Sequence, residues 1–158
     1  MTVLTHEAAW TVVATVPDPE LPHVTIGDLG MVRDVRVGVG GVEVDITPTY
    51  TACPATEAIC ADIVAALATA GAPGARVQVR LAPAWSSDDI TPLGRAKLAA
   101  AGIAPPGAAA SGAVELPPPC PRCGSRRTRL VSWFGATACK SAHGCQACAE
   151  PFEAFKSI

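Results

Sequence analysis

The sequence of 158 residues has little charge and few aromatic side chains, 16% and 4% of the chain respectively. No stretch approaches the roughly 18 uninterrupted apolar residues that a membrane-spanning helix needs, so no membrane partner is expected. Residues 1–16 lack a basic start, and they carry His6 and Glu7 where a secretory signal would be apolar. We therefore expect a cytoplasmic protein.

Motifs of independent catalysis are also missing. The sequence has no glycine-rich phosphate loop, and no nucleophile stands in a recognisable pattern with histidine and an acid. Asp18 and Glu20 form a pair of acids, but two carboxylates in a proline-rich loop are more typical of a turn. The formal net charge of −2 argues weakly against nucleic acid or an anionic membrane as the main partner. None of these patterns points to an enzyme.

Cysteine is abundant, with seven residues. In a cytoplasmic chain such a number indicates metal or thiol chemistry rather than a disulfide framework. An odd number also leaves at least one thiol without a cysteine partner.

Charge and composition divide the chain into three parts. Residues 1–119 have a net charge of −6 and residues 120–158 a net charge of +4. Between the two, residues 102–119 are rich in proline, glycine and alanine, which sustain neither a helix nor a central strand. We expect a domain at 1–101, a linker at 102–119 and a small module at 120–158.

The first domain has the pattern of a compact α/β (α+β) fold in the order α-β-β-α-β-α. Thr5 can cap a first helix that Pro17 ends, and Pro54 suits the first turn of a second helix running to residue 70. The other elements are an alternating hairpin of strands 31–37 and 42–47, a strand at 75–81 and a helix from Thr91-Pro92 to residue 101.

Two C-x-x-C pairs in the second part form the strongest chemical signal. They are separated by 21 residues, close to the usual spacing of a four-cysteine site. Two tight turns can each aim two sulfurs at one tetrahedral ion, as in a zinc ribbon. We expect Zn²⁺ here, with iron or an iron–sulfur cluster as the alternative, and strands at 129–134 and 152–155 that pair with each other. The expected ligands are Cys120, Cys123, Cys145 and Cys148.

Three further cysteines lie outside this pattern. Cys139 is either a spare loop thiol or a low-pKa thiol or substitute ligand, and nearby His143 is an alternative ligand. Cys60 falls on the apolar stripe of the second helix and is expected in the core. Cys53 directly precedes Pro54, where the positive end of a helix lowers a thiol pKa, so it is a candidate reactive or ligand thiol, or else a buried loop residue.

Several runs resemble known families. Residues 18–22 (DPELP), 26–32 (IGDLGMV) and 47–54 (TPTYTACP) resemble the SufT-like domain of iron–sulfur cluster assembly. Residues 85–106, 134–140 and 150–156 narrow the resemblance to the PaaD (or PaaJ) family, which supplies the D component of the phenylacetyl-CoA epoxidase system. That family often ends in Phe-Lys-Cys-Ile, whereas Ser157 precedes the last residue here.

The resemblance implies an accessory subunit in aerobic phenylacetate catabolism. It implies maturation or repair of the iron or iron–sulfur centres of the epoxidase oxygenase and reductase, with Cys53 carrying or transferring iron or a transient iron–sulfur cluster. The oxygenase and reductase subunits and the iron–sulfur assembly machinery are the implied partners, and the basic module would dock an acidic client. Two alternatives are a non-catalytic structural subunit and a nucleic-acid-binding ribbon that uses Arg122, Arg126, Arg127 and Arg129.

Overall fold

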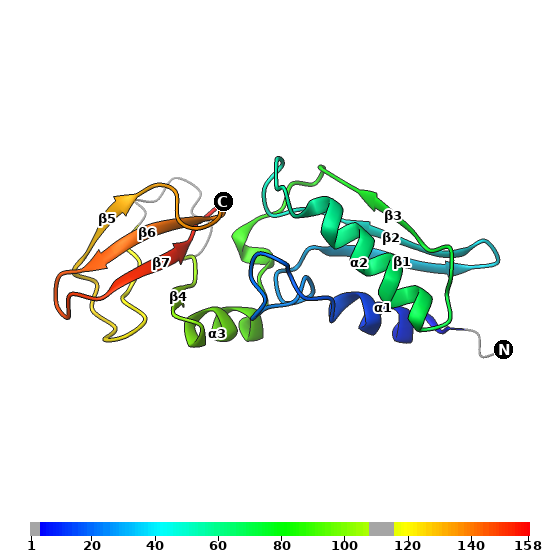
Figure 1. Ribbon diagram of the computed structural model, residues 1–158, viewed down its shortest axis with the longest axis horizontal. Helices are drawn as coiled ribbons and strands as arrows, with labels where there is room; N and C mark the ends of the chain where they lie inside the picture. Colours follow the sequence, from blue (N-terminus) through cyan, green and yellow to red (C-terminus); the bar gives the residue numbers. More distant parts are fainter. Residues whose placement is uncertain (1–3, 108–115) are drawn as a thin grey trace. The chain divides into compact units, whose positions relative to one another are not determined.

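The computed structural model describes residues 4–107 and 116–158, and the chain divides into two compact units after Trp85 (Figure 1). The chain contains both helices and strands, and the strands form two β-sheets. This confirms the expected mixed α/β class. Each unit is described by itself below. Within residues 4–107 and 116–158, no helix is both long and apolar enough to cross a membrane.

The first unit begins with helix α1 (His6–Ala14), capped as the sequence predicts. The Thr5 hydroxyl accepts a hydrogen bond from the amide of Ala8 at 3.2 Å, which satisfies one of the free donors of the first turn. The chain then runs through a proline-rich loop that lies close against the helix. An added Cβ on Gly27 would stand 2.5 Å from the Ala14 carbonyl oxygen, so this approach requires glycine.

A three-stranded sheet forms the rest of the first unit. Strands β1 (Val32–Gly38) and β2 (Gly41–Ile46) pair antiparallel as the expected hairpin, and Gly41 adopts a φ of 107° where the turn ends. Helix α2 (Thr56–Thr69) then crosses to β3 (Arg76–Val79), which pairs parallel with β2. Both helices pack on this sheet, α1 against β1 and α2 against β3, and contact each other. The core between them is aliphatic, with Ile46, Ile59, Ile63 and Leu67 fully buried.

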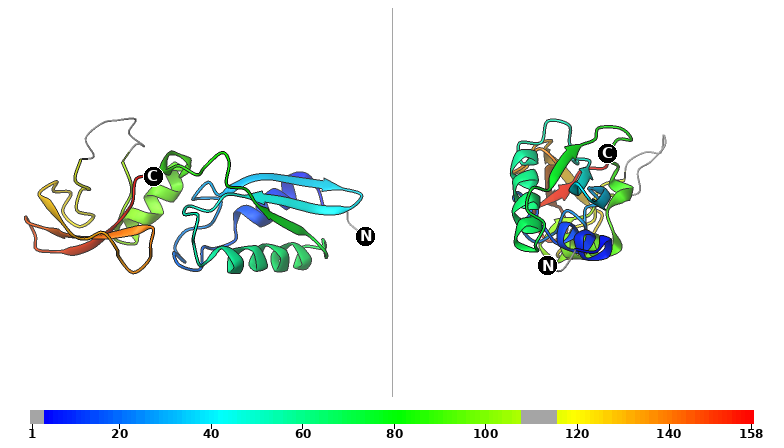
Figure 2. Two further views of the ribbon diagram at one scale, coloured as in Figure 1. Left: turned by 90° about the horizontal axis from the view of Figure 1, so that it is seen from above. Right: turned by 90° about the vertical axis from the view of Figure 1, so that its right-hand side faces the viewer.

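The second unit begins with a short 3₁₀ turn, η1 (Ser87–Asp89), and helix α3 (Pro92–Ala100). Thr91 caps α3 by accepting a hydrogen bond from Gly94, as its sequence position predicts. A four-stranded sheet follows in the order β4-β7-β6-β5, with the strands labelled in Figure 1 and drawn from two further sides in Figure 2. Its strands are β4 (Ile103–Ala104), β5 (Thr128–Ser132), β6 (Lys140–Cys145) and β7 (Pro151–Phe155).

The expected pairing of the ribbon strands is wrong. The segments predicted at 129–134 and 152–155 correspond to β5 and β7, but β6 lies between them and pairs with both. The prediction missed β6 because Ser141, Ala142 and Gly144 give it little of the apolar alternation that marks a strand.

The boundary between the units also differs from the expected limits of 1–101 and 102–119. The division after Trp85 groups α3 with the second unit. Ile103 and Ala104, expected in the linker, form β4 and pair parallel with Glu153 and Ala154 of β7. The middle of the expected linker, 108–115, lies outside the described residues.

Candidate metal centre and upstream thiol

The first C-x-x-C pair lies in a tight turn ahead of β5. The amide of Gly124 donates to the carbonyl of Cys120 at 2.8 Å, and Gly124 adopts a φ of 73°. That left-handed conformation suits glycine, which lets the chain reverse directly after Cys123. The turn therefore brings both side chains of the pair to one side.

The second pair spans the turn between β6 and β7. Cys145 is the last residue of β6, and its amide donates to the carbonyl of Glu150 at 2.8 Å, which closes the turn. The amide of Ala147 donates to the sulfur of Cys145 at 3.4 Å. Ala149 takes a positive φ of 63° beyond Cys148. This turn repeats the arrangement of the first pair on the other side of the site.

The two turns bring all four sulfurs together. They lie within 4.8 Å of one another, with Cys120 and Cys148 separated by 3.8 Å and Cys123 and Cys145 by 3.6 Å. Four thiolates at about 2.3 Å from a tetrahedral ion would stand about 3.8 Å apart. The observed spacing fits such an ion, and the cluster indicates metal binding. Because iron takes similar thiolate sites, the spacing does not distinguish it from zinc.

The electrostatics of the four thiols favour a cation at their centre. The amide of Cys148, aided by that of Ala147, lowers the pKa of the Cys145 thiol to about 7. The amide of Glu150 acts in the same direction on Cys148, but burial and the neighbouring cysteines prevail and raise its pKa to about 12. Four adjacent sulfurs therefore resist ionising together unless a positive ion compensates their charge.

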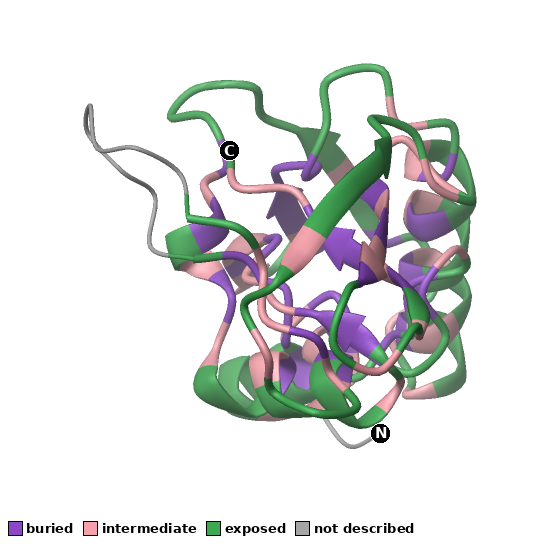
Figure 3. Cartoon of the chain, turned by 90° about the vertical axis from the view of Figure 1, so that its left-hand side faces the viewer, coloured by how far each residue is buried: buried purple, intermediate pink, exposed green. Residues whose placement is uncertain are grey.

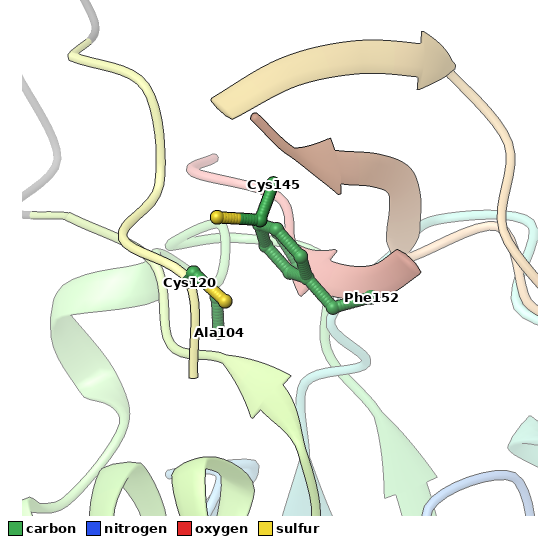
Figure 4. Close-up of a cluster of buried hydrophobic side chains, with 5 residues drawn as sticks. Ala104, Cys120, Cys145 and Phe152 are labelled. Atoms are coloured by element: carbon green, nitrogen blue, oxygen red, sulfur yellow. The ribbon is translucent and has the colours of Figure 1, made fainter. Parts of the chain in front are cut away.

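Two of the four sulfurs are also part of a hydrophobic cluster. Cys120 and Cys145 are buried in the same cluster as Phe152, and Figure 4 shows these side chains together. Ala104 of β4 and Ala154 of β7 complete the cluster. The candidate metal centre and the core of the ribbon thus share two side chains.

Cys139 and His143 stand outside the four-sulfur cluster. Cys139 is buried just ahead of β6, with its sulfur 3.1 Å from the Thr137 hydroxyl. His143 lies in β6 rather than in a loop, stacks on Phe152 at 5.5 Å between ring centroids, and has Nε2 2.9 Å from the Ser141 hydroxyl. Neither residue belongs to the set of possible metal ligands found among the described residues.

Cys53 occupies a different setting from the one expected. Helix α2 begins at Thr56 with Ala55 as its cap residue, so Cys53 and Pro54 lie in the preceding turn. Burial raises the pKa of the Cys53 thiol; the amide of Ala55 opposes this, and the charges of Glu20 and Asp18 add to it. The expected lowering of this pKa is therefore wrong. The sequence placed the helix start too early and gave no sign of these carboxylates.

The acidic loop near Cys53 is itself a tight turn, as the sequence predicts. One oxygen of Asp18 accepts hydrogen bonds from the amides of Glu20 at 2.8 Å and Leu21 at 3.0 Å. Burial nevertheless raises the pKa of the Asp18 carboxyl. Cys60 is half-buried on α2, and burial raises its pKa too. The structure thus places one thiol, Cys53, within electrostatic range of two acids.

Comparisons with known proteins match both units. Residues 6–81 match the family described as iron-sulfur cluster assembly protein, and residues 104–156 match the PaaD zinc beta ribbon domain. Among solved structures, the domain of unknown function DUF59 from Bacillus anthracis is 27% identical with a TM-score of 0.55, covering 59% of this chain and 90% of its own. A conserved hypothetical protein from Thermotoga maritima is also 27% identical, with a TM-score of 0.52, covering 62% and 98%.

The fold and the cysteine cluster together define a class: an iron–sulfur assembly-type α/β domain joined to a zinc ribbon. A curated protein of Escherichia coli (strain K12), named as the D subunit of 1,2-phenylacetyl-CoA epoxidase, is 47% identical over 94% of this chain and 91% of its own length. The chain belongs to this PaaD family of phenylacetyl-CoA epoxidase subunits.

Proposed function

We propose that this protein is an accessory subunit of a phenylacetyl-CoA epoxidase system that matures or repairs the iron or iron–sulfur centres of its oxygenase or reductase. The main support is the match of residues 6–81 to iron–sulfur cluster assembly proteins, a stretch that contains Cys53, Asp18 and Glu20. The four-cysteine site would hold a structural metal, and Cys53 would hold the transferred iron or cluster.

The setting of Cys53 suits a thiol that receives a cation. Its raised pKa keeps it protonated at neutral pH, and the nearby carboxylates attract positive charge. When a ferrous ion binds, the new sulfur–iron bond replaces the sulfur–hydrogen bond and the proton passes to water. The same carboxylates that disfavour a free thiolate would therefore stabilise the iron-bound one.

The test replaces Cys53 by alanine in the native host, with Cys60→Ala as the matched control. Both thiols are half-buried and belong to the same unit, but Cys60 lies within α2. Growth on phenylacetate and the iron content of the purified epoxidase are measured together. We expect both to fall for Cys53→Ala and to stay normal for Cys60→Ala. Normal values for Cys53→Ala would refute the transfer role.

A structural subunit without transfer chemistry is the second candidate, favoured by the word subunit in the name of the Escherichia coli relative. It predicts co-purification with the epoxidase at a fixed ratio and unchanged iron content in the Cys53 variant. A maturation factor would instead be present at less than one copy per complex.

A further inference from the structure

The outer strand of the ribbon carries an exposed apolar surface. β5 is the last strand of its sheet, and Figure 3 shows it almost wholly exposed, whereas β6 beside it is largely buried. Val131 on this strand is 58% exposed, and Trp133 and Phe134 just after it are 63% and 71% exposed. Three large apolar side chains so close in sequence are an unusual concentration for a protein with few aromatics.

The turn that follows β5 is held in a fixed shape. The amide of Phe134 donates to the Ser132 hydroxyl at 3.1 Å, and the amide of Gly135 donates to the carbonyl of Lys140 at 2.8 Å. Next along the chain, the amide of Ala136 donates to the Glu153 carboxylate. Phe134 is therefore presented by an ordered turn, which reduces the entropy lost when a partner binds.

Positively charged residues precede the apolar ones along the chain. Arg126, Arg127 and Arg129 form no ion pair with any carboxylate in the described part of the chain, and Arg126 bonds only to a carbonyl. The two acids of residues 120–158, Glu150 and Glu153, are already paired with other cations. We call Arg126, Arg127, Arg129, Val131, Trp133 and Phe134 the β5 surface.

Arg129 and Val131 lie side by side on this surface. Gly144 of β6 lies opposite Arg129, and a Cβ built on it would stand 3.9 Å from Nε of Arg129 and 3.8 Å from Cγ2 of Val131. Both side chains therefore extend over the same glycine. A partner that fits here needs carboxylates and apolar side chains within a few residues of each other.

We propose that the β5 surface docks an acidic segment of another polypeptide that also carries apolar anchor residues. Protein is favoured over nucleic acid because Val131 offers no ring for stacking and the ammonium of Lys156 lies 4.6 Å over the Phe134 ring, occupying one of its faces. The chain as a whole also has a net charge of −2. The acidic and apolar character of the partner follows from the β5 surface itself. Only the partner's identity, as a subunit of the epoxidase system, rests on the proposed function.

The test is photo-cross-linking in the native host growing on phenylacetate. A benzophenone amino acid replaces Trp133 in the full chain, and the control carries it at Leu93, an equally exposed site on α3. We expect cross-links from position 133, and not from 93, to a segment of another protein rich in Asp and Glu. Cross-links to nucleic acid, to a second copy of this chain or to a segment without acids would overturn the proposal, as would a yield no higher than the control.

Charge variants test the role of the arginines. Replacing Arg126, Arg127 and Arg129 together by glutamine should lower the yield from position 133 about tenfold. Arg122→Gln is the control, since Arg122 is already paired with Glu150. Metal content equal to the parent shows that each variant is folded. An unchanged yield in the triple variant would refute the electrostatic part. Neither readout involves iron, so failure here and failure of the Cys53 test are distinguishable.

Discussion

Removing the metal should unfold the ribbon and leave the first unit intact. The hydrophobic cluster beside the four sulfurs consists of Ala104, Cys120, Cys145, Phe152 and Ala154, and two of these five are expected ligands. Without the ion, the direct links between the turn ahead of β5 and the turn between β6 and β7 are the exposed Arg122–Glu150 ion pair and the hydrogen bond from the Gln146 amide to the Arg127 carbonyl, which are weak beside four metal–sulfur bonds. The first unit has its own aliphatic core and depends on no cysteine of that cluster.

The magnitudes favour complete loss of the ribbon. Full burial of Phe152 is worth about 1.5–3 kcal/mol, and the two alanines add less. A structural zinc ion supplies about 10–16 kcal/mol in small zinc-dependent modules, whereas a whole domain is stable by about 5–15 kcal/mol. Loss of the metal therefore exceeds what the remaining contacts around the site can offset.

Hydrogen exchange measured by mass spectrometry would follow both units in one sample. We expect a chelator under reducing conditions to abolish protection of the amides of β6, Lys140–Cys145, and of the non-proline residues of β7, 152–155, while the β2 amides, Gly41–Ile46, keep theirs. Adding the metal back should restore the protection. Persistent protection of β6 in a sample shown to be free of metal would refute the reasoning.

Three other perturbations have defined outcomes. Lys140→Met removes the partner of a partly buried carboxylate and should cost about 3 kcal/mol in urea unfolding, whereas Arg122→Met, which breaks an exposed pair, should cost under about 1 kcal/mol; equal costs would contradict the burial argument. Gly27→Ala places a Cβ against a carbonyl oxygen and should destabilise by about 1–3 kcal/mol, while Gly38→Ala meets no atom within 4 Å and should change stability little. The pKa of Cys53 is raised, so its alkylation rate should reach half of its maximum at a pH above ~8.5, where a free cysteine reaches half of its own. A half-maximal rate at or below that pH would contradict the raised pKa.

The parts of the fold that sequence reasoning predicted are those set by near neighbours. The caps at Thr5 and Thr91 and the hairpin turn that ends at Gly41 each depend on a few adjacent residues, and all three are present. Strand β4 could not be foreseen, because Ile103 and Ala104 become a strand only by pairing with β7, about fifty residues later in the chain.

The two candidate sites also differ in whether near neighbours or distant residues determine them. The four expected ligands follow a local spacing that each turn enforces by itself, so the sequence located all four members of the sulfur cluster. The pKa of Cys53 depends on its burial and on the charges of Asp18 and Glu20 from a distant loop. No pattern around Cys53 carries that information, and the helix-end argument consequently gave the wrong direction.

Cys120 and Cys145 are core side chains as well as expected ligands, so we expect the ribbon to lose its folded form when its ion is missing. In a cell short of that element, newly made copies would expose their tails to proteases. The amount of intact protein would then follow the supply of the element, with no dedicated regulator involved.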